Sequence, residues 1–449
     1  MKQSRYDLLL HEKNLYKAFT ILALPVFMAN IIKSLHDLVD TYFIGQMENS
    51  VAAQAGLSIA WPPINILMSF TIGLSVAGVS VISQLLGAGK KEEAKKYSGL
   101  LVLLAVGLGV VVNIILYFLS PAILSLMGAE GDVHIAATSY LRTRSFEMIF
   151  TFLFCAFQAI RQAKGDTITP VILSTTSVVI NIILTAYFIR VCGMGVEGAA
   201  LATVIGQGLI TPICLFLLFR KKEENHLQFT DLRFELESMK KLFTIATPSA
   251  CSQAFSAFGF LILQAVILDY GEVVTAAFSI GNKITNLLLM PVMALGSVLA
   301  AYVGQNIGAK QPERAMKAYK VSRNLGLAIS VIGAVILYLF HKPMIELLSN
   351  NAETQLVAAE YMFWVVLTQP LMSLFQNYIG VFNGSGNTRF SFAMSTTRLW
   401  LIRLPLILCF KTFTDFGRVG IWAAMVISNF IIVLFGSFLF KKVDFKPKV

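Results

Sequence analysis

Long apolar stretches, separated by short polar and charged segments, dominate the pattern of hydrophobic and polar positions in this chain. The run from Leu100 to Met127 contains no charged residue, and an apolar run of about 18 residues or more can cross a bilayer. The alternation over about ten residues that marks membrane β-strands is absent from the sequence. The pattern therefore predicts an all-α integral membrane protein with twelve transmembrane helices. The predicted spans are residues 15–45, 52–86, 96–119, 134–163, 168–190, 196–219, 240–268, 274–307, 318–340, 355–383, 390–410 and 420–440.

The two halves of the chain repeat one pattern of residues at a single offset. Gln84 and Gly87 recur 221 residues later as Gln305 and Gly308. The same offset relates these first-half residues to identical second-half residues: Gln84, Gly87, Ala88, Glu92, Ala94, Lys96, Gly165, Thr167 and Ser174–Thr176. Gly87 and Gly308 are each followed by Ala, which is typical of a helix C-terminal cap in a left-handed backbone.

This repeat predicts two pseudo-twofold-related six-helix lobes, comprising residues 1–219 and 240–449. Residues 220–239 form the loop between them. Because each half has an even number of spans, both lobes have the same orientation and an axis near the membrane normal relates them. A site at the interface of two such repeats is typical of secondary transporters.

Composition and charge agree with a membrane protein. Hydrophobic residues make up 56% of the chain and charged residues 14%, against about 25% charged residues in soluble domains. The net charge of +11 suggests a nucleic-acid partner, but 26 of the 36 Lys and Arg lie at the termini and in the loops after even-numbered spans. This asymmetry follows the positive-inside rule. It predicts no nucleic-acid partner, an integral protein of the plasma membrane surrounded by lipid, and cytoplasmic termini.

Motifs for enzymatic chemistry are missing from the sequence. It contains no phosphate-binding Walker loop and no G-x-S-x-G nucleophile motif. The five cysteines are scattered in apolar segments, at spacings that fit neither a metal site nor a disulfide framework. We therefore expect no enzyme activity, no cofactor and no metal. A small organic substrate and a monomeric state are the expectations for its partners.

Ionisable residues inside the spans are the candidates for function, because a charge at a helix centre costs about 2.5–3.5 kcal/mol on insertion scales. The densest group is in the first span: Lys33, His36, Asp37 and Asp40. At 100° per residue these four side chains share one stripe of the helix. The stripe predicts an ion or proton site; paired charges with a purely structural role are the alternative.

The spans of the second half carry cations instead. Lys283, Arg398 and Arg403 lie within spans, and no acid lies at the centre of spans 7–12. These cations suit an anionic or zwitterionic substrate group; pairing with helix C-termini or lipid headgroups is the alternative. The candidate residues of a substrate cavity are Lys33, His36, Gln158, Lys283 and Arg398.

An ordered series of short motifs resembles the multidrug and toxic compound extrusion (MATE) family, in its bacterial type. The motifs are Leu-Val-Asp-Thr-Tyr-Phe-Ile-Gly at 38–45, the Gln-x-x-Gly-Ala corner at 84–88, Arg-Gln-Ala-Lys-Gly-Asp-Thr-Ile-Thr-Pro at 161–170, Asn-Ile-Ile-Leu at 181–184, Gly-Val-Glu-Gly-Ala-Ala at 195–200 and Gly-Gln-Asn-Ile-Gly-Ala at 304–309. The resemblance implies two six-helix lobes around a cavity that opens to one side at a time. It also implies efflux driven by a proton or sodium gradient.

The same resemblance implies roles for individual residues. Asp40 matches the aspartate of the family's first helix that takes part in cation coupling, with Asp37 beside it. Asn181 matches a polar partner on the fifth helix, and Thr185 stands where the family often has a second acid. The missing acid and the cation at Lys33 favour protons over sodium, because a proton needs a single carboxylate whose pKa can move.

Two other functions remain open from the sequence. A flippase for lipid-linked oligosaccharides, from the same superfamily, would require a basic cavity, which Lys33, Lys283 and Arg398 would supply. An ion channel is the second alternative, although no pore-lining repeat is found.

Overall fold

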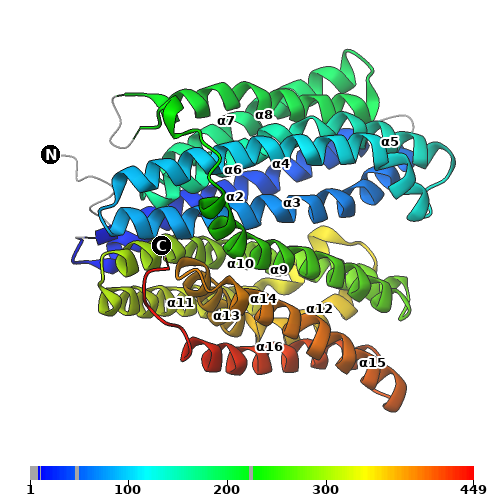
Figure 1. Cartoon of the computed structure of the whole chain (residues 1–449). Helices are drawn as coiled ribbons and strands as arrows, with labels where there is room; N and C mark the ends of the chain where they lie inside the picture. Colours follow the sequence, from blue (N-terminus) through cyan, green and yellow to red (C-terminus); the bar gives the residue numbers. More distant parts are fainter. Residues whose placement is uncertain (1–8, 11, 46–49, 222–225, 449) are drawn as a thin grey trace.

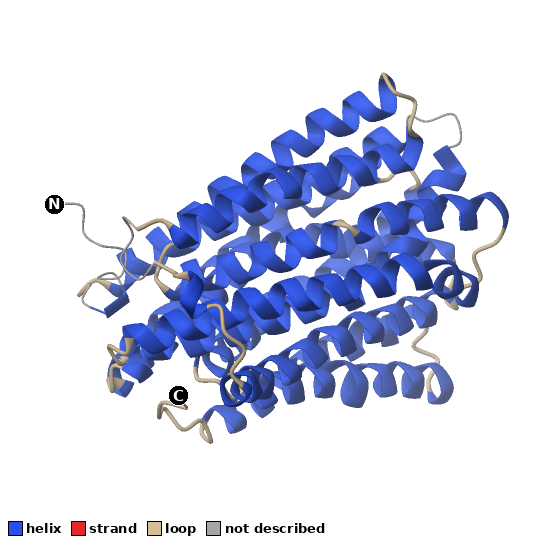
Figure 2. Ribbon diagram, turned by 45° about the horizontal axis from the view of Figure 1, so that its top comes forward, coloured by secondary structure: helices blue, strands red, loops and turns tan. Residues whose placement is uncertain are grey.

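The computed structural model describes residues 9–10, 12–45, 50–221 and 226–448, without the side chains of 36–42, 44–45 and 50–54. Within this part of the chain every regular element is a helix, and the long helices run side by side (Figures 1 and 2). The elements are α2 (Leu15–Gly45), α3 (Ser50–Gly87), α4 (Lys91–Leu126), α5 (Gly131–Ser145), α6 (Glu147–Ala163), α7 (Ile168–Arg190), α8 (Gly195–Phe219), η1 (Phe229–Asp231), α9 (Leu236–Leu268), α10 (Glu272–Gly308), α11 (Pro312–Leu348), α12 (Ala352–Val366), α13 (Gln369–Gly384), α14 (Thr388–Thr396), η2 (Thr397–Arg403), α15 (Leu404–Phe413) and α16 (Arg418–Phe440).

The helices reproduce the twelve predicted spans, two of them as broken helices. Ten spans in the described chain are long and apolar enough to cross a membrane, and α12 with α13 forms an eleventh that bends by 53°. The remaining span is α5 with α6, interrupted at Phe146. Phe146 and Leu367 are 221 residues apart, so both lobes break the same helix at the same place. At the second break Pro370, in the first turn of α13, has no N–H to continue the ladder from α12.

Two lobes lie side by side, with α2–α8 in one and α9–α16 in the other (Figure 1). Helix α3 of the first lobe packs along α9 and α10, and α10 packs along α2 and α3. The offset relates α2 to α9 and α3 to α10, so each lobe contributes the same two helices to the interface. This arrangement confirms the pseudo-twofold architecture.

The helix corners after α3 and α10 correct one detail of the sequence analysis. The residue in the left-handed region is Gly89, with φ +74°, and its equivalent Lys310, with φ +56°. Neither Gly87 nor Gly308 has a positive φ. Glycine adopts this backbone at little cost because it has no Cβ. Lys310 therefore carries strain that Gly89 avoids. The repetition of Gly87 as Gly308 therefore has another cause, which lies between the lobes.

Candidate functional site

Reciprocal hydrogen bonds join the lobes at the end of the bundle that carries both termini (Figure 1). The Gln84 Nε2 donates to the carbonyl oxygen of Gly384 at 3.1 Å. The Gln305 Nε2 donates to the carbonyl oxygen of Ala163 at 2.5 Å. Both donors and both acceptors are 221 residues apart, so the two bonds are images of each other about the pseudo-twofold axis. We call this contact zone, formed by Gln84, Ala163, Gln305 and Gly384, the closed end.

The glycines of the repeated motif bring the two backbones together at the closed end. A Cβ on Gly87 would overlap the carbonyl oxygen of Gln305, and a Cβ on Gly308 would overlap that of Gln84. A Cβ on Gly304 would overlap the Ser83 hydroxyl. These small residues therefore permit a close approach of helices, and that approach takes place between the lobes.

Further polar contacts reinforce the closed end. Gln162 Nε2, on α6, donates to the carbonyl and hydroxyl oxygens of Ser297 on α10, both at 2.7 Å. The C-terminal segment crosses to the first lobe, where the Lys448 backbone N–H donates to Gln84 Oε1 at 3.0 Å. Burial lowers the pKa of the Lys448 ammonium, and the nearby Arg389 lowers this pKa further. Because the backbone N–H of Lys448 makes the contact with Gln84, the tail links the two lobes through its backbone.

A central cavity of about 290 Å³ lies between the lobes, beside the closed end. Its walls come from α3, α6, α10 and α13, and almost every lining residue is matched by its equivalent in the other lobe. The pairs are Ile72 and Met293, Ser75 and Gly296, Val76 and Ser297, Val79 and Ala300, Cys155 and Gln376, Gln158 and Ile379, and Gln162 and Asn383. The cavity therefore lies on the pseudo-twofold axis.

The lining of this cavity combines apolar side chains with uncharged polar ones. Gln158, a substrate-cavity candidate from the sequence, lies in the wall, and Gln162, Gln376 and Asn383 add three further amides. Lys33 is exposed on α2 and close enough to Cys155 to act on it electrostatically. Uncharged amides and hydroxyls can bind many ligands by hydrogen bonds without selecting one charge.

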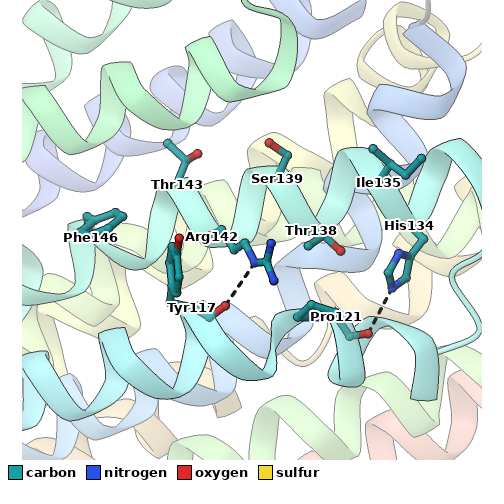
Figure 3. A pocket seen from close by; sticks show the side chains of 9 residues that line it. All are labelled: Tyr117, Pro121, His134, Ile135, Thr138, Ser139, Arg142, Thr143 and Phe146. Atoms are coloured by element: carbon teal, nitrogen blue, oxygen red, sulfur yellow. Dashed lines mark hydrogen bonds between the residues drawn. The ribbon is translucent and has the colours of Figure 1, made fainter.

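A larger pocket, of about 550 Å³, lies on α4 and α5 of the first lobe alone (Figure 3). The Arg142 Nε donates to the carbonyl oxygen of Tyr117 at 3.4 Å, and the His134 ring donates to that of Pro121 at 3.1 Å. Ile135, in its wall, is 68% exposed. Because this hollow borders one lobe only, it is not placed to sense the relative position of the two lobes.

Two of the predicted coupling residues, Asn181 and Thr185, lie on α7, which packs against α2. Asn181 and Thr185 are buried one helical turn apart. The Asn181 Nδ2 donates to Thr203 Oγ1 on α8 at 3.0 Å. The Asn181 Oδ1 and the Thr185 Oγ1 have no hydrogen-bond partner among the described residues. The side chains of the α2 stripe, His36, Asp37 and Asp40, lie outside the described residues.

The cations of the second lobe take two different positions. Lys283 is exposed on α10. Arg398 and Arg403 belong to η2, a π-helical segment in the eleventh span, and both are partly buried. Arg403 donates to Ser428 Oγ at 3.0 Å and to Asn429 Oδ1 at 2.7 Å. None of the carboxylates that the structure describes forms an ion pair with either arginine. Insertions of this kind into α-helices are frequent at functional sites.

A buried ion pair at the helix break of the first lobe has no counterpart in the second. The Arg144 Nε and the Glu147 Oε2 are 2.8 Å apart, and Thr151 also donates to Glu147. The residue equivalent to Glu147 is Thr368, whose hydroxyl donates to the backbone carbonyl of Val365 in the preceding turn. The first lobe thus pairs Arg144 with a carboxylate, whereas Arg398 and Arg403 of the second lobe form no ion pair with a described carboxylate.

Several contacts of the site cannot be predicted from the sequence. Thr203 joins Asn181 only because α8 packs beside α7. Gln162 and Ser297 meet across the lobe interface at positions 135 residues apart. The 221-residue offset relates the bonds of Gln84 and Gln305 to each other, but it cannot say which residues touch. That information required the two lobes to be placed together.

The chain is similar to known transporters over nearly its full length. A family model described as MatE matches residues 25–187 and 248–408. "Probable multidrug resistance protein YoeA" from Bacillus subtilis is 25% identical, with 98% of each chain covered. A protein named "FAD transporter" from Shewanella oneidensis is 27% identical, covering 88% of this chain and 87% of that protein.

Solved structures share the fold. A MOP superfamily transporter from Pyrococcus furiosus aligns with a TM-score of 0.91 and 22% identity, covering 98% of each chain. The family model spans more than half of the sequence, and the two-lobe helical architecture agrees with it. The chain therefore belongs to the MatE family of multidrug and toxic compound extrusion transporters, and it is an integral membrane transport protein rather than an enzyme.

Proposed function

We propose that this chain is a secondary active antiporter that exports small, mostly amphipathic or cationic organic compounds by alternating access, driven by proton rather than sodium influx. One observation carries the proposal: a cavity on the pseudo-twofold axis is shut at one end by the reciprocal bonds of Gln84 and Gln305. Alternating access requires a fixed binding region between two repeats and an end that opens and closes.

The closed end is weak enough to open during transport. A hydrogen bond contributes about 0.5–1.5 kcal/mol net, and the lobes are joined there by the bonds of Gln84, Gln305 and Gln162 together with the tail contact of Lys448. Breaking such a set costs a few kcal/mol. A ligand can supply a difference of this size if it binds one conformation about a hundredfold or more tightly than the other.

Protons are supported by the chemistry of the first-lobe residues. A protonated carboxyl group donates a hydrogen bond, and the unpartnered oxygens of Asn181 and Thr185 are acceptors within the lobe whose α2 helix carries Asp40. A neutral Thr185 supplies less charge than an acid would for a sodium ion. We therefore assign coupling to Asp40, with Asp37, Asn181 and Thr185 as its surroundings.

The proposal includes an orientation and a boundary. The lobes comprise residues 1–219 and 240–449, and the loop 220–239 joins them on the cytoplasmic side of the plasma membrane. Both termini then face the cytoplasm, since Lys and Arg concentrate on that side. With this orientation the closed end seals the cavity from the cytoplasm, and the protein works as a monomer within lipid.

Transport by the purified protein in liposomes tests the proposal. An imposed pH gradient in sodium-free buffer should drive movement of a fluorescent cationic dye such as ethidium. The relative named as an FAD transporter is a reason to test flavin nucleotides in the same assay. Asp40→Asn should abolish the gradient-driven movement, whereas Asp132→Asn, at an exposed site on α5, should leave it unchanged. Transport that needs sodium at constant pH and moves no protons would contradict proton coupling.

A further inference from the structure

Arg398 is a partly buried cation whose described partners are unusually weak. Its Nη1 lies 3.1 Å from the Met372 sulfur, and its guanidinium carbon lies 4.6 Å from the centroid of the Phe375 ring. The buried Nε has no hydrogen-bond partner among the described residues. A thioether is a weak acceptor, and a cation–π contact is a modest attraction. These contacts do not replace the carboxylate that a buried guanidinium normally has.

A second positive charge strengthens the local field. Arg403, five residues along η2, is close enough to Arg398 to act on it electrostatically. Ser428 and Asn429 hold Arg403 in place through neutral oxygens, so they fix its geometry and leave its charge uncompensated. Two like charges in one lobe of a membrane protein are costly, and an added negative charge would offset that cost.

The position of Arg398 in the fold connects it with transport. Its equivalent in the first lobe is Ser177, which lies one turn from Asn181 on α7. Its contacts Met372 and Phe375 lie on α13 within one turn of Gln376, which lines the central cavity. The second lobe therefore carries a cation at the depth where the first lobe carries the candidate coupling residues.

We infer that Arg398, supported by Arg403, is a binding site for the anionic group of an amphipathic substrate: a carboxylate, sulfonate or phosphate. The planar guanidinium offers paired N–H donors to two oxygens of such a group. Leaving the Met372 sulfur costs little, so the side chain is free to turn toward a ligand. This inference rests on the proposed transport function and adds amphipathic organic anions to its substrate class.

Two aromatic probes of opposite charge separate this inference from a general affinity for apolar ligands. Naphthalene-2-sulfonate and 2-naphthyltrimethylammonium share one ring system, so calorimetry on the purified protein compares charge alone. Arg398→Gln should weaken sulfonate binding by about tenfold or more, the loss typical of a hydrogen bond to a charged group. Arg398→Lys keeps the charge and should weaken it less. Binding of the ammonium probe should be unchanged or tighter in Arg398→Gln.

Arg418→Gln serves as the matched control, because Arg418 pairs with Glu360 at the partly exposed surface of the lobe. This variant should bind both probes as the parent does. A structural role for Arg398 would lower the melting temperature of Arg398→Gln and weaken both probes together, and that result would overturn the inference. Equal sulfonate affinity in the parent and Arg398→Gln, or no sulfonate binding by the parent, would also overturn it. Gradient-driven export of a cationic dye in the same preparations would show that the transport proposal survives such a failure.

Discussion

Removing the Gln84 side chain should shift the protein away from the closed conformation by an amount that the contacts allow us to estimate. Gln84 forms two bonds to the second lobe, one to the Gly384 carbonyl at 3.1 Å and one from the Lys448 N–H at 3.0 Å. At about 0.5–1.5 kcal/mol each, Gln84→Ala destabilises the closed end by about 1–3 kcal/mol. This energy corresponds to roughly a 5- to 150-fold change in the ratio of open to closed molecules.

Gln305→Ala should have about half of this effect. Its Nε2 donates to the Ala163 carbonyl, but its Oε1 has no partner among the described residues. One inter-lobe bond is lost instead of two. The two glutamines occupy equivalent positions in the repeat, so the difference between them isolates the contribution of the Lys448 contact. A variant that ends before Lys448 should therefore make the two glutamine substitutions nearly equal.

Cys155 provides the measurement, because its side chain lines the central cavity. With the other four cysteines replaced by serine, a membrane-impermeant methanethiosulfonate is applied from the side of the termini. The labelling rate should be low in the parent, higher in Gln305→Ala and highest in Gln84→Ala. Gln228→Ala, at an exposed position in the loop between the lobes, is the control. If Gln84→Ala labels no faster than the parent or the Gln228 control, the closed end is not what protects the cavity.

Three further substitutions test the packing of the lobes by thermal unfolding. Gly308→Ala should lower stability by about 1–3 kcal/mol and speed the labelling described above, because its Cβ would overlap the Gln84 carbonyl oxygen. Glu147→Gln should cost about 3 kcal/mol, since it leaves the buried Arg144 without its carboxylate; a loss under 1 kcal/mol would contradict the buried pair. Lys310→Gly should raise stability by about 1 kcal/mol, because Lys310 has a left-handed backbone, and no gain would mean that its side chain compensates for the strain.

Most of the fold could be predicted from the sequence, because apolar length and the repeat are local and periodic signals. The breaks at Phe146 and Leu367 could not. The first has no proline to mark it, and Pro370 lies inside an apolar run that reads as one continuous span. Helix bends of this kind depend on what packs beside the helix. The left-handed backbone of Lys310 could not be predicted either, because nothing in a lysine signals a positive φ.

Charged residues inside the spans could be picked out from the sequence, because burying a charge in a membrane is costly. Residues that act through a partner in the other lobe could not. Gln158, singled out from the sequence as a cavity candidate, lies in the wall of the cavity between the lobes. Arg398 was singled out by its charge, although its contacts with Met372 and Phe375 were not foreseen. The carbonyl partners of Gln84 could not be inferred from the sequence, because every residue has a carbonyl and only the packing selects one.

The difference between the lobes limits how coupling can work in this protein. If the coupling ion and the substrate bound at one place, they would compete directly. Here the acids of α2 and the oxygens of Asn181 and Thr185 belong to the first lobe, whereas the unpaired arginines belong to the second. Ligands held in separate lobes can influence each other through the relative position of those lobes. At the closed end each lobe holds the other by the same bond, so any movement that breaks the Gln84 bond also strains its twin at Gln305.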